Sequence, residues 1–365
     1  MLQHPSSRSY DKTGPHGMRA EPKESYVAGR RALVTGGAGF IGGTLVRRLL
    51  THGWVITAFD SLDGPPSARE RKLRDLKRAL RSPRFKLVEG DTRDATAIKG
   101  AAESLRPSVI FDLAARAGVR PSMRDPLGYI DVNVRGLQNT LSAAAEVRAR
   151  VVFASSSSVY GNDPRRPFRE DQAQGQPTSP YGATKVAGEA FVQAHRVATG
   201  LAIGIARLFT VYGPRQRPDL AINLFANRIL DGEVIELFAE GLGVRDYTYV
   251  DDAVDALVRM ATSPHSSLVL NIGSHHPIQT RAVVAELERA LQTAAIVRPA
   301  AAQPGDVEAT FADIGRARER LGWEPKVPFS EGIDRFSAWL REERALEERR
   351  STDVDKPAQT LGPGR

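Results

Sequence analysis

The sequence predicts an α/β protein built around one parallel sheet that carries helices on both faces. Two observations support this fold class: short apolar, β-branched segments alternate with helical stretches, and a glycine-rich loop follows the first apolar segment. Because parallel strands need crossover connections, usually helices, the alternation predicts a doubly wound sheet. The expected strands lie at about 31–35, 54–59, 84–88, 108–113, 150–155 and 202–207.

The glycine-rich loop predicts the first ligand. Arg31–Thr35 leads into Gly36-Gly-Ala-Gly-Phe-Ile-Gly42 and then into a helix. A tight turn needs positive φ, a pyrophosphate needs backbone without Cβ atoms, and a helix N-terminus offers free N–H groups. This unit predicts a Rossmann-like, dinucleotide-binding fold. The cofactor contacts expected from it are Gly36, Gly39, Phe40, Ile41 and Gly42.

An acidic residue, Asp60, ends the second predicted strand. An acid at this point can hydrogen-bond the adenosine ribose hydroxyls and repels a 2′-phosphate. No Arg directly follows Asp60, so we expect NAD rather than NADP. Residues at the ends of the next two strands are also expected to contact the cofactor: Asp91, Thr92, Leu113, Ala114 and Ala115.

A Tyr–Lys pair predicts the chemistry. Tyr181 and Lys185 are spaced i, i+4, so on a helix they share one face. Ser179 is a plausible N-cap for that helix, with Pro180 at its first position. The preceding strand ends in the hydroxyls of Ser155–Ser158, at the strand terminus where doubly wound sheets bind ligands. Asn133 lies in an apolar helix before that strand and is expected to contact the cofactor.

With these motifs in place, the chain resembles the extended short-chain dehydrogenase/reductase superfamily and, within it, the nucleotide-sugar 4-epimerases. The resemblance runs from about Arg30 to Trp339. The matching stretches are Gly36–Gly42, Gly90–Asp94, Leu113–Ala115, Ser155–Gly161, Tyr181–Lys185 and Arg245–Asp252.

The resemblance implies a role for each reactive group. Tyr181 is expected to be the general base, taking the proton from O4 of the sugar, and Ser156 to hydrogen-bond the reacting hydroxyl. Lys185 is expected to stabilise the phenolate and to hold the nicotinamide ribose. A 4-keto sugar would then turn and regain hydrogen on its other face. NAD ends the cycle unchanged.

Two rival reactions use the same core. Sugar 4,6-dehydratases carry an Asp-Glu pair where this chain has Ser157 and Ser158, and UDP-glucuronate decarboxylases typically carry Glu at the second of these positions. Elimination at C5–C6 needs a general acid and a base near those carbons, and serines are poor substitutes. We therefore expect epimerisation. A non-catalytic dinucleotide-binding protein is a further alternative, although such proteins usually lack the Tyr or the Lys.

The sugar is predicted from a weaker resemblance. Phe209–Leu220 and Gln303–Val307 resemble UDP-glucuronate 4-epimerases, which interconvert UDP-glucuronate and UDP-galacturonate. Hydroxyls of Ser157, Ser158 and Thr210 could hold the sugar carboxylate. UDP-glucose and UDP-N-acetylglucosamine remain alternatives. The other expected substrate contacts are Arg217, Arg245 and Asp306.

Length and composition predict one large core with a subsidiary lobe, from 365 residues that are 41% hydrophobic. Residues 1–28 are expected to be disordered, 29–212 to form the NAD-binding domain with returns at about 250–275, and 213–340 to form mainly a substrate-binding lobe. The last helix should end near Leu340, leaving a charged tail over 341–365 that frays.

Several functions are disfavoured. The chain has no Cys, which excludes disulfides and cysteine metal sites and suits a cytoplasmic location, and we assign no metal. No apolar run reaches membrane-spanning length. Most of the +8 net charge lies in Arg69–Lys86, where we expect a solvated helix face rather than a nucleic-acid site.

The resemblance implies a homodimer, with candidate interface helices at roughly 122–148 and 179–199.

Overall fold

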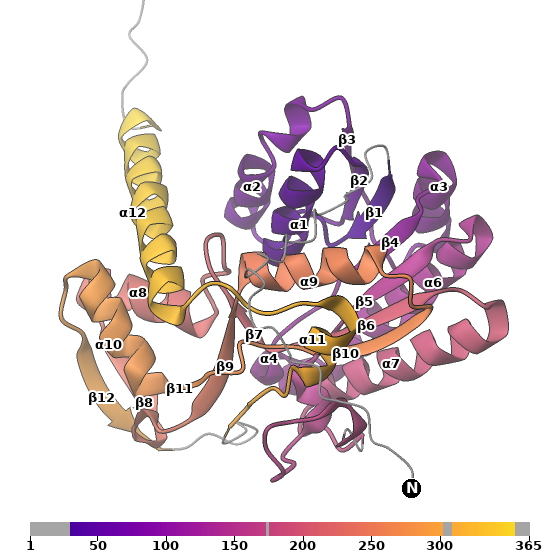
Figure 1. Ribbon diagram of the computed structural model, residues 1–365. Coiled ribbons are helices and arrows are strands. Elements are labelled where there is room, and N and C mark those ends of the chain that lie inside the picture. The colour runs from indigo at the N-terminus through magenta and orange to yellow at the C-terminus, as the bar shows by residue number, and fades with distance from the viewer. Residues whose placement is uncertain (1–29, 173–174, 302–308, 355–365) are drawn as a thin grey trace, which may run out of the picture.

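The computed structural model describes residues 30–172, 175–301 and 309–354, with side chains up to 349 (Figure 1). The expected disordered segment, residues 1–28, and Asp306 lie outside the described residues. None of the described helices is long and apolar enough to cross a membrane.

A seven-stranded parallel sheet forms the centre of the molecule and confirms the predicted fold class. Its order is β10-β6-β5-β4-β1-β2-β3, so the direction of winding reverses between β1 and β4. Ligands of such sheets bind outside the strand ends at this reversal. The strands are β1 (Arg31–Thr35), β2 (Val55–Asp60), β3 (Phe85–Glu89), β4 (Val109–Asp112), β5 (Arg150–Ser156), β6 (Ile203–Leu208) and β10 (Ser267–Ile272).

Helices cover both faces of the sheet, and each face has its own hydrophobic core (Figure 1). Alternate residues of one strand serve the two cores, since Ala32 and Val34 of β1 belong to one cluster and Leu33 to the other. Helices α1 (Phe40–Thr51) and α9 (Val250–Thr262) pack on one face. The other face is covered by α3 (Ala95–Leu105), α6 (Gly136–Val147) and α7 (Pro180–Thr199).

The chain beyond β6 builds two further small sheets before and after its return to the main sheet through β10. One contains β7 (Thr210–Tyr212), β9 (Val244–Tyr249) and β11 (Pro277–Gln279), and the other pairs β8 (Val234–Phe238) with β12 (Ile296–Ala300). The helices of this region are α8 (Ala221–Asp231), α10 (Thr280–Leu291), α11 (Gly315–Leu321) and α12 (Phe329–Val354).

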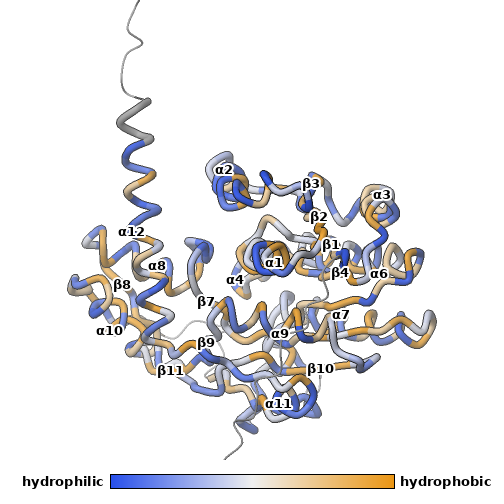
Figure 2. Tube along the Cα trace, turned by 45° about the horizontal axis from the view of Figure 1, so that its top comes forward, coloured by the Kyte–Doolittle hydropathy of each residue, from blue (hydrophilic) through white to orange (hydrophobic). Residues whose placement is uncertain are grey.

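Two helix predictions were wrong. The last helix does not end near Leu340: α12 continues to Val354, and its outer part is largely hydrophilic (Figure 2). Ion pairs support the extension, because Arg344 contacts Asp231 of α8 and Glu343 contacts Arg74.

The helix expected at 122–148 is broken before α6. It consists of α4 (Val119–Arg124), α5 (Pro126–Ile130) and a π-helical turn, η2 (Asp131–Arg135), followed by α6. Asp125 precedes Pro126, and the residue before proline is disfavoured in a helical conformation. Short 3₁₀ turns lie at Ala79–Arg81, Ser157–Tyr160, Glu170–Gln172 and Ala239–Gly241.

A buried polar network fastens the segment after β5 to the sheet. Arg207 of β6 donates two hydrogen bonds to the Glu189 carboxylate, at 2.9 and 2.8 Å, and a third to Tyr160 Oη at 3.0 Å. Ser155 donates to Glu189 Oε1 at 2.6 Å, and Tyr160 donates to Asn271 Oδ1 at 2.6 Å. The network therefore joins β5, β6, α7 and β10 beneath the serine run.

We predict that Arg207→Met destabilises the protein by about 3–5 kcal/mol, because it leaves the Glu189 carboxylate buried without its cation. The double variant Arg207→Met/Glu189→Gln should recover at least half of that loss, since the unpaired charge is then gone. Urea unfolding of the two variants measures both effects. A single-variant loss below about 1 kcal/mol would show that the pair is not important for stability.

Candidate functional site

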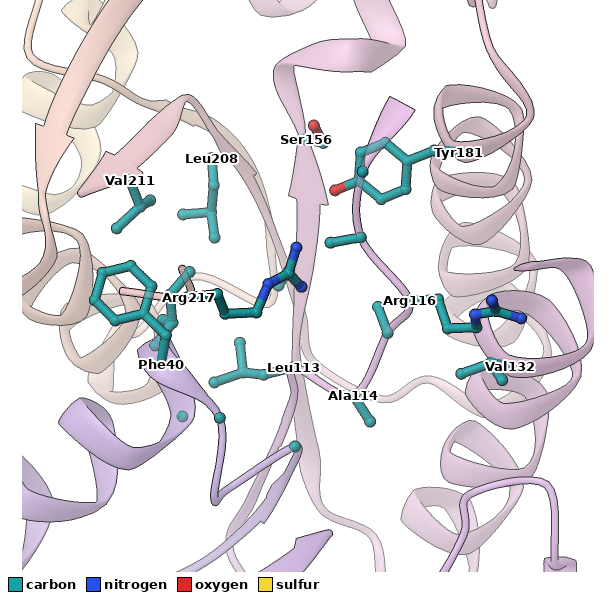
Figure 3. Close-up of a pocket in the computed structure, with 18 of the residues that line it drawn as sticks. Phe40, Leu113, Ala114, Arg116, Val132, Ser156, Tyr181, Leu208, Val211 and Arg217 are labelled. Carbon is teal, nitrogen blue, oxygen red and sulfur yellow. The ribbon is translucent and has the colours of Figure 1, made fainter. Parts of the chain in front are cut away.

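Most of the predicted site residues meet in one cavity of about 1090 Å³ at the carboxyl ends of the strands (Figure 3). The glycine loop, the ends of β2, β4 and β5, the first turns of α7 and the segment after β7 all contribute to its wall. The predicted residues that line it are Gly36, Gly39, Phe40, Ile41, Gly42, Asp60, Asp91, Thr92, Leu113, Ala114, Ala115, Ser156, Ser157, Ser158, Tyr181, Lys185, Thr210, Arg217 and Arg245.

The glycine loop has the geometry that close backbone packing requires. Gly36 has φ of +64°, and a Cβ atom there would lie 2.9 Å from the backbone of Leu113 and Ala114. A Cβ on Gly42 would lie 2.1 Å from the Gly36 carbonyl oxygen. Gly39 is the N-cap of α1 and supplies no side-chain cap, so the first N–H groups of this helix remain available to an anion. These residues fit the pyrophosphate of a dinucleotide.

Asp60 is held firmly at the cavity wall, with only 6% of its surface exposed. Its Oδ2 accepts the Ala38 N–H at 3.0 Å, and its Oδ1 accepts the Leu62 N–H at 2.8 Å. Lys72 of α2 (Pro66–Asp75) also donates to Oδ1, at 3.1 Å. A carboxylate offers about four lone-pair positions, so Oδ2 keeps one for a ribose hydroxyl.

The start of α7 confirms the predicted cap and places the reactive pair. The Gly182 N–H donates to Ser179 Oγ at 3.1 Å, with Pro180 as the first helical residue. One turn separates Tyr181 from Lys185, and both face the cavity. Figure 3 shows Tyr181, Ser156 and Arg217 directed into the same space, although they come from α7, β5 and the segment after β7.

Burial dominates the titration of the phenol. It raises the pKa of Tyr181 above its ordinary value, while a hydrogen bond with Ser156 and the charge of Arg217 lower it. The expected stabilisation of the phenolate by Lys185 stays a prediction. The Lys185 ammonium donates to the Ala154 carbonyl at 2.8 Å and lies 6.0 Å from the centroid of the Tyr181 ring. Two cations thus lie near the phenol: Arg217, whose charge lowers the pKa of Tyr181, and Lys185, which lies over its ring.

Lys185 is itself buried, with 4% of its surface exposed. Burial lowers its pKa to about 8, against the raising effect of the charges of Asp112 and Glu189. At neutral pH the ammonium is thus charged in a poorly solvated site. A buried charge of this kind lowers the stability of the fold. Proteins keep such charges mainly at sites where the charge has a function.

The serine run forms a turn of polar groups opposite Tyr181. Ser156 Oγ accepts the Ser158 N–H at 3.1 Å and lies 3.1 Å from Ser158 Oγ, so Ser158 lies next to the residue that contacts the phenol. Thr210 of β7 also lines the cavity, as do Arg217 and Arg245. Arg217 forms an ion pair with Asp219 at 2.8 Å.

Asn133 lies behind the cavity wall. It is 2% exposed and does not line the cavity. Its Oδ1 accepts the Arg116 N–H at 2.8 Å, and its Nδ2 donates to the Arg116 carbonyl and to Thr184 Oγ1 at 3.0 Å each. Asn133 thus holds the segment after β4 against α7, and its contact with the cofactor stays a prediction.

Further residues of the cavity wall were not predicted from the sequence. They come from α2, from the segment after β7 and from α5: Arg71, Lys72, Asp75, Arg215 and Tyr129. Tyr129 makes an edge contact with the Tyr181 ring at 6.3 Å between centroids. The run of basic residues in α2 was a sequence signal for this part of the wall, but we expected it to form a solvated helix face. Arg71 and Lys72 of that run are half-buried at the cavity instead.

Comparison with known proteins identifies the family to which this fold and site belong. Residues 32–273 match the profile of the NAD dependent epimerase/dehydratase family. The chain belongs to that family. NAD is the cofactor of this family, and the glycine loop and Asp60 fit it.

This chain matches individual relatives in the family over nearly their full length. A probable UDP-glucuronate 4-epimerase of Rhizobium meliloti is 34% identical, over 85% of this chain and 96% of the relative. A UDP-glucose 4-epimerase of Mycolicibacterium smegmatis is 38% identical, over 85% and 98%. The crystal structure of UDP-glucuronic acid 4-epimerase from Bacillus cereus, with UDP-glucuronic acid and NAD, has a TM-score of 0.80 at 30% identity, over 86% and 99%.

We predict that Lys185→Met is more stable than the wild type at pH 7 by roughly 1–3 kcal/mol, because it removes a buried charge. The folded-state pKa, about 8, lies below the ordinary 10.5, so the unfolded chain binds more protons between these values. Wild-type stability therefore rises with pH through this window, and the advantage of the variant should shrink. Urea unfolding at pH 7 and pH 9.5 measures this, and an advantage that is absent at pH 7 or constant with pH would contradict it.

Proposed function

We propose that this protein is a UDP-glucuronate 4-epimerase that interconverts UDP-glucuronate and UDP-galacturonate. The observation that carries the proposal is the set of hydroxyl groups beside the phenol. Ser156, Ser157 and Ser158 follow one another at the end of β5, and Thr210 lines the same cavity. The likeness to relatives named for this activity supports it.

In the proposed reaction Tyr181 is the general base. The phenolate removes the proton of the sugar 4-hydroxyl, and Ser156 holds that hydroxyl and the phenol in line. NAD, when bound, supplies a reversible acceptor for the hydrogen at C4. Tyr181 then returns the proton after the 4-keto sugar has turned about its diphosphate link. No net oxidation results.

Three cations assist the proposed reaction. Arg217 lowers the pKa of the phenol from within the cavity, and its guanidinium is also placed to contact an anionic part of the substrate. Arg245 lines the cavity from β9 and is our proposed contact for the diphosphate. Lys185, at the base of the cavity, is proposed to hold the nicotinamide ribose, with its ammonium kept charged by Asp112 and Glu189.

The hydroxyl set suits a uronate for a chemical reason. A 4-keto uronate is a β-keto acid and loses CO₂ readily when its carboxylate can align with the carbonyl. Ser157, Ser158 and Thr210 can donate hydrogen bonds that fix the carboxylate out of that alignment. The absence of an acid at 157 and 158 also disfavours elimination and decarboxylation, which need acid–base groups near C5.

UDP-glucose is the second candidate substrate, because the relative from Mycolicibacterium smegmatis with 38% identity is a UDP-glucose 4-epimerase. A separate incubation of the pure protein with each sugar nucleotide, followed by NMR of the product, distinguishes the two.

We expect UDP-galacturonate from UDP-glucuronate, with no net NADH at 340 nm. Thr210→Ala and Ser158→Ala should lower kcat/KM for UDP-glucuronate by about tenfold or more each, since each removes a hydrogen bond to a charged group. Turnover of UDP-glucose alone, or of both sugars with these variants unchanged, would reject the uronate assignment.

We further propose that the protein is a homodimer through α5 and α7. These neighbouring helices expose large apolar side chains, among them Leu127 and Val197 at 76% each and Phe191 at 41%. Packing them against a second copy would remove this surface from water.

Sedimentation velocity tests the dimer. The wild type should sediment as a dimer at micromolar concentration, and Val197→Arg should shift it towards monomer, because a charge is placed in an apolar contact. Val234→Arg, on β8, is the matched control and should leave the dimer intact. A monomeric wild type, or a dimer unaffected by Val197→Arg, would contradict this interface.

A further inference from the structure

The segment between β7 and α8, residues 213–220, carries Arg217 into the cavity and has a conformation that other parts of the molecule must hold. Arg217 lines the cavity and points into the space that Tyr181 faces (Figure 3). Two residues earlier, Arg215 has φ of +71°, in a region that residues with a Cβ rarely adopt. A backbone in that region persists only where surrounding contacts fix it. The contacts that fix this segment therefore also set the place of Arg217.

One anchor reaches this segment from α8. Asn223 is 3% exposed, and its Nδ2 donates to the Gln216 carbonyl at 2.6 Å. Asn227, one turn later, donates to Asn223 Oδ1 at 2.6 Å and so fixes the direction of the Asn223 amide. Arg344 of α12 donates to Asn227 Oδ1 at 3.2 Å. These hydrogen bonds form one chain that runs from α12 to the residue before Arg217.

A second anchor reaches the same segment from α2. Arg215 donates to Asp75 Oδ1 at 3.2 Å. Arg74, the neighbour of Asp75, forms an ion pair with Glu343 of α12. Glu343 and Arg344 are adjacent, so consecutive residues of α12 contact the two helices to which the segment is tied. Both residues lie in the stretch that the sequence predicted as a fraying tail.

The groups around the phenol show what a displaced segment would change. The charged or titratable side chains at Tyr181 are Arg217, Lys185 of the same helix and Tyr129 of α5. Of these three, Arg217 is the one that the segment carries, and its charge lowers the pKa of Tyr181. Loss of its position would raise the pKa of the phenol and leave the other two groups in place.

We propose that Arg344 is a positioning residue of the active site, through which the last turns of α12 hold the 213–220 segment and keep Arg217 beside the phenol. The inference rests on the proposed function, since it concerns the base of that reaction. It also gives a function to the extension of α12 past Leu340.

The pH dependence of kcat/KM tests this role, in protein loaded with NAD and with whichever sugar nucleotide the wild type converts. Tyr181 acts as a base in its phenolate form, and a nearby cation stabilises that form. Arg344→Met should therefore move the acidic limb of the profile to higher pH by about 0.5–1 unit. The loss of kcat/KM should be about three- to tenfold larger on that limb than on the plateau.

Asp231→Asn is the matched control. It removes the ion pair between Asp231 and Arg344 but leaves the bond from Arg344 to Asn227, so it should keep the limb in place. Arg341→Met, three residues earlier on α12, loses a hydrogen bond to the Ala290 carbonyl of α10 and should keep it in place too.

An unmoved limb in Arg344→Met, or a loss that is equal at every pH, would overturn the positioning role. So would an equal shift in the two controls. The ultraviolet absorbance of the phenolate, taken as the difference between each protein and its Tyr181→Phe counterpart, follows the same pKa without turnover. A wild type that converts neither sugar would contradict the proposed function, and this difference titration would still decide the role of Arg344.

Discussion

The burial of a phenol beside a cation is the interaction on which the proposed chemistry depends. Burial alone makes Tyr181 a poorer base, because a phenolate is less stable away from water than a neutral phenol. Arg217 and Ser156 oppose that effect from two separate parts of the chain. The site can therefore work only where the fold brings α7, β5 and the segment after β7 together.

The parallel sheet achieves this meeting. All seven strands run the same way, so their carboxyl ends form one edge, and the reversal between β1 and β4 opens a crevice along it. The glycine loop after β1 lies on one side of the crevice and the serine run after β5 on the other. The network of Arg207 and Glu189 stiffens the second side, since it ties β5 and β6 to α7 directly below the serine run.

Local signals predicted the parts of the fold and site that depend on backbone conformation. The positive φ and crowding at Gly36, the cap at Ser179 and the helical spacing of Tyr181 and Lys185 all follow from nearest neighbours in sequence. Each has one physical cause that acts over a few residues.

Features that depend on tertiary contacts were less accessible. The sequence does not show that Asn133, in the π-helical turn η2, binds the backbone of Arg116. It also does not show that α2 lies over the cavity, nor that α12 continues to Val354 where ion pairs with Asp231 and Arg74 support it. The same limit applies to Lys185, whose hydrogen-bond partner is the carbonyl of Ala154 on another element.

Loss of the phenol is the most direct test of this chemistry. Tyr181→Phe keeps the ring and its edge contact with Tyr129 but removes the group that moves the proton. In protein loaded with NAD, we expect the rate of 4-epimerisation to fall by about 10²–10⁴-fold while the Kd for the UDP-sugar stays within a few fold. An undiminished rate of inversion in that variant would show that Tyr181 is not the base.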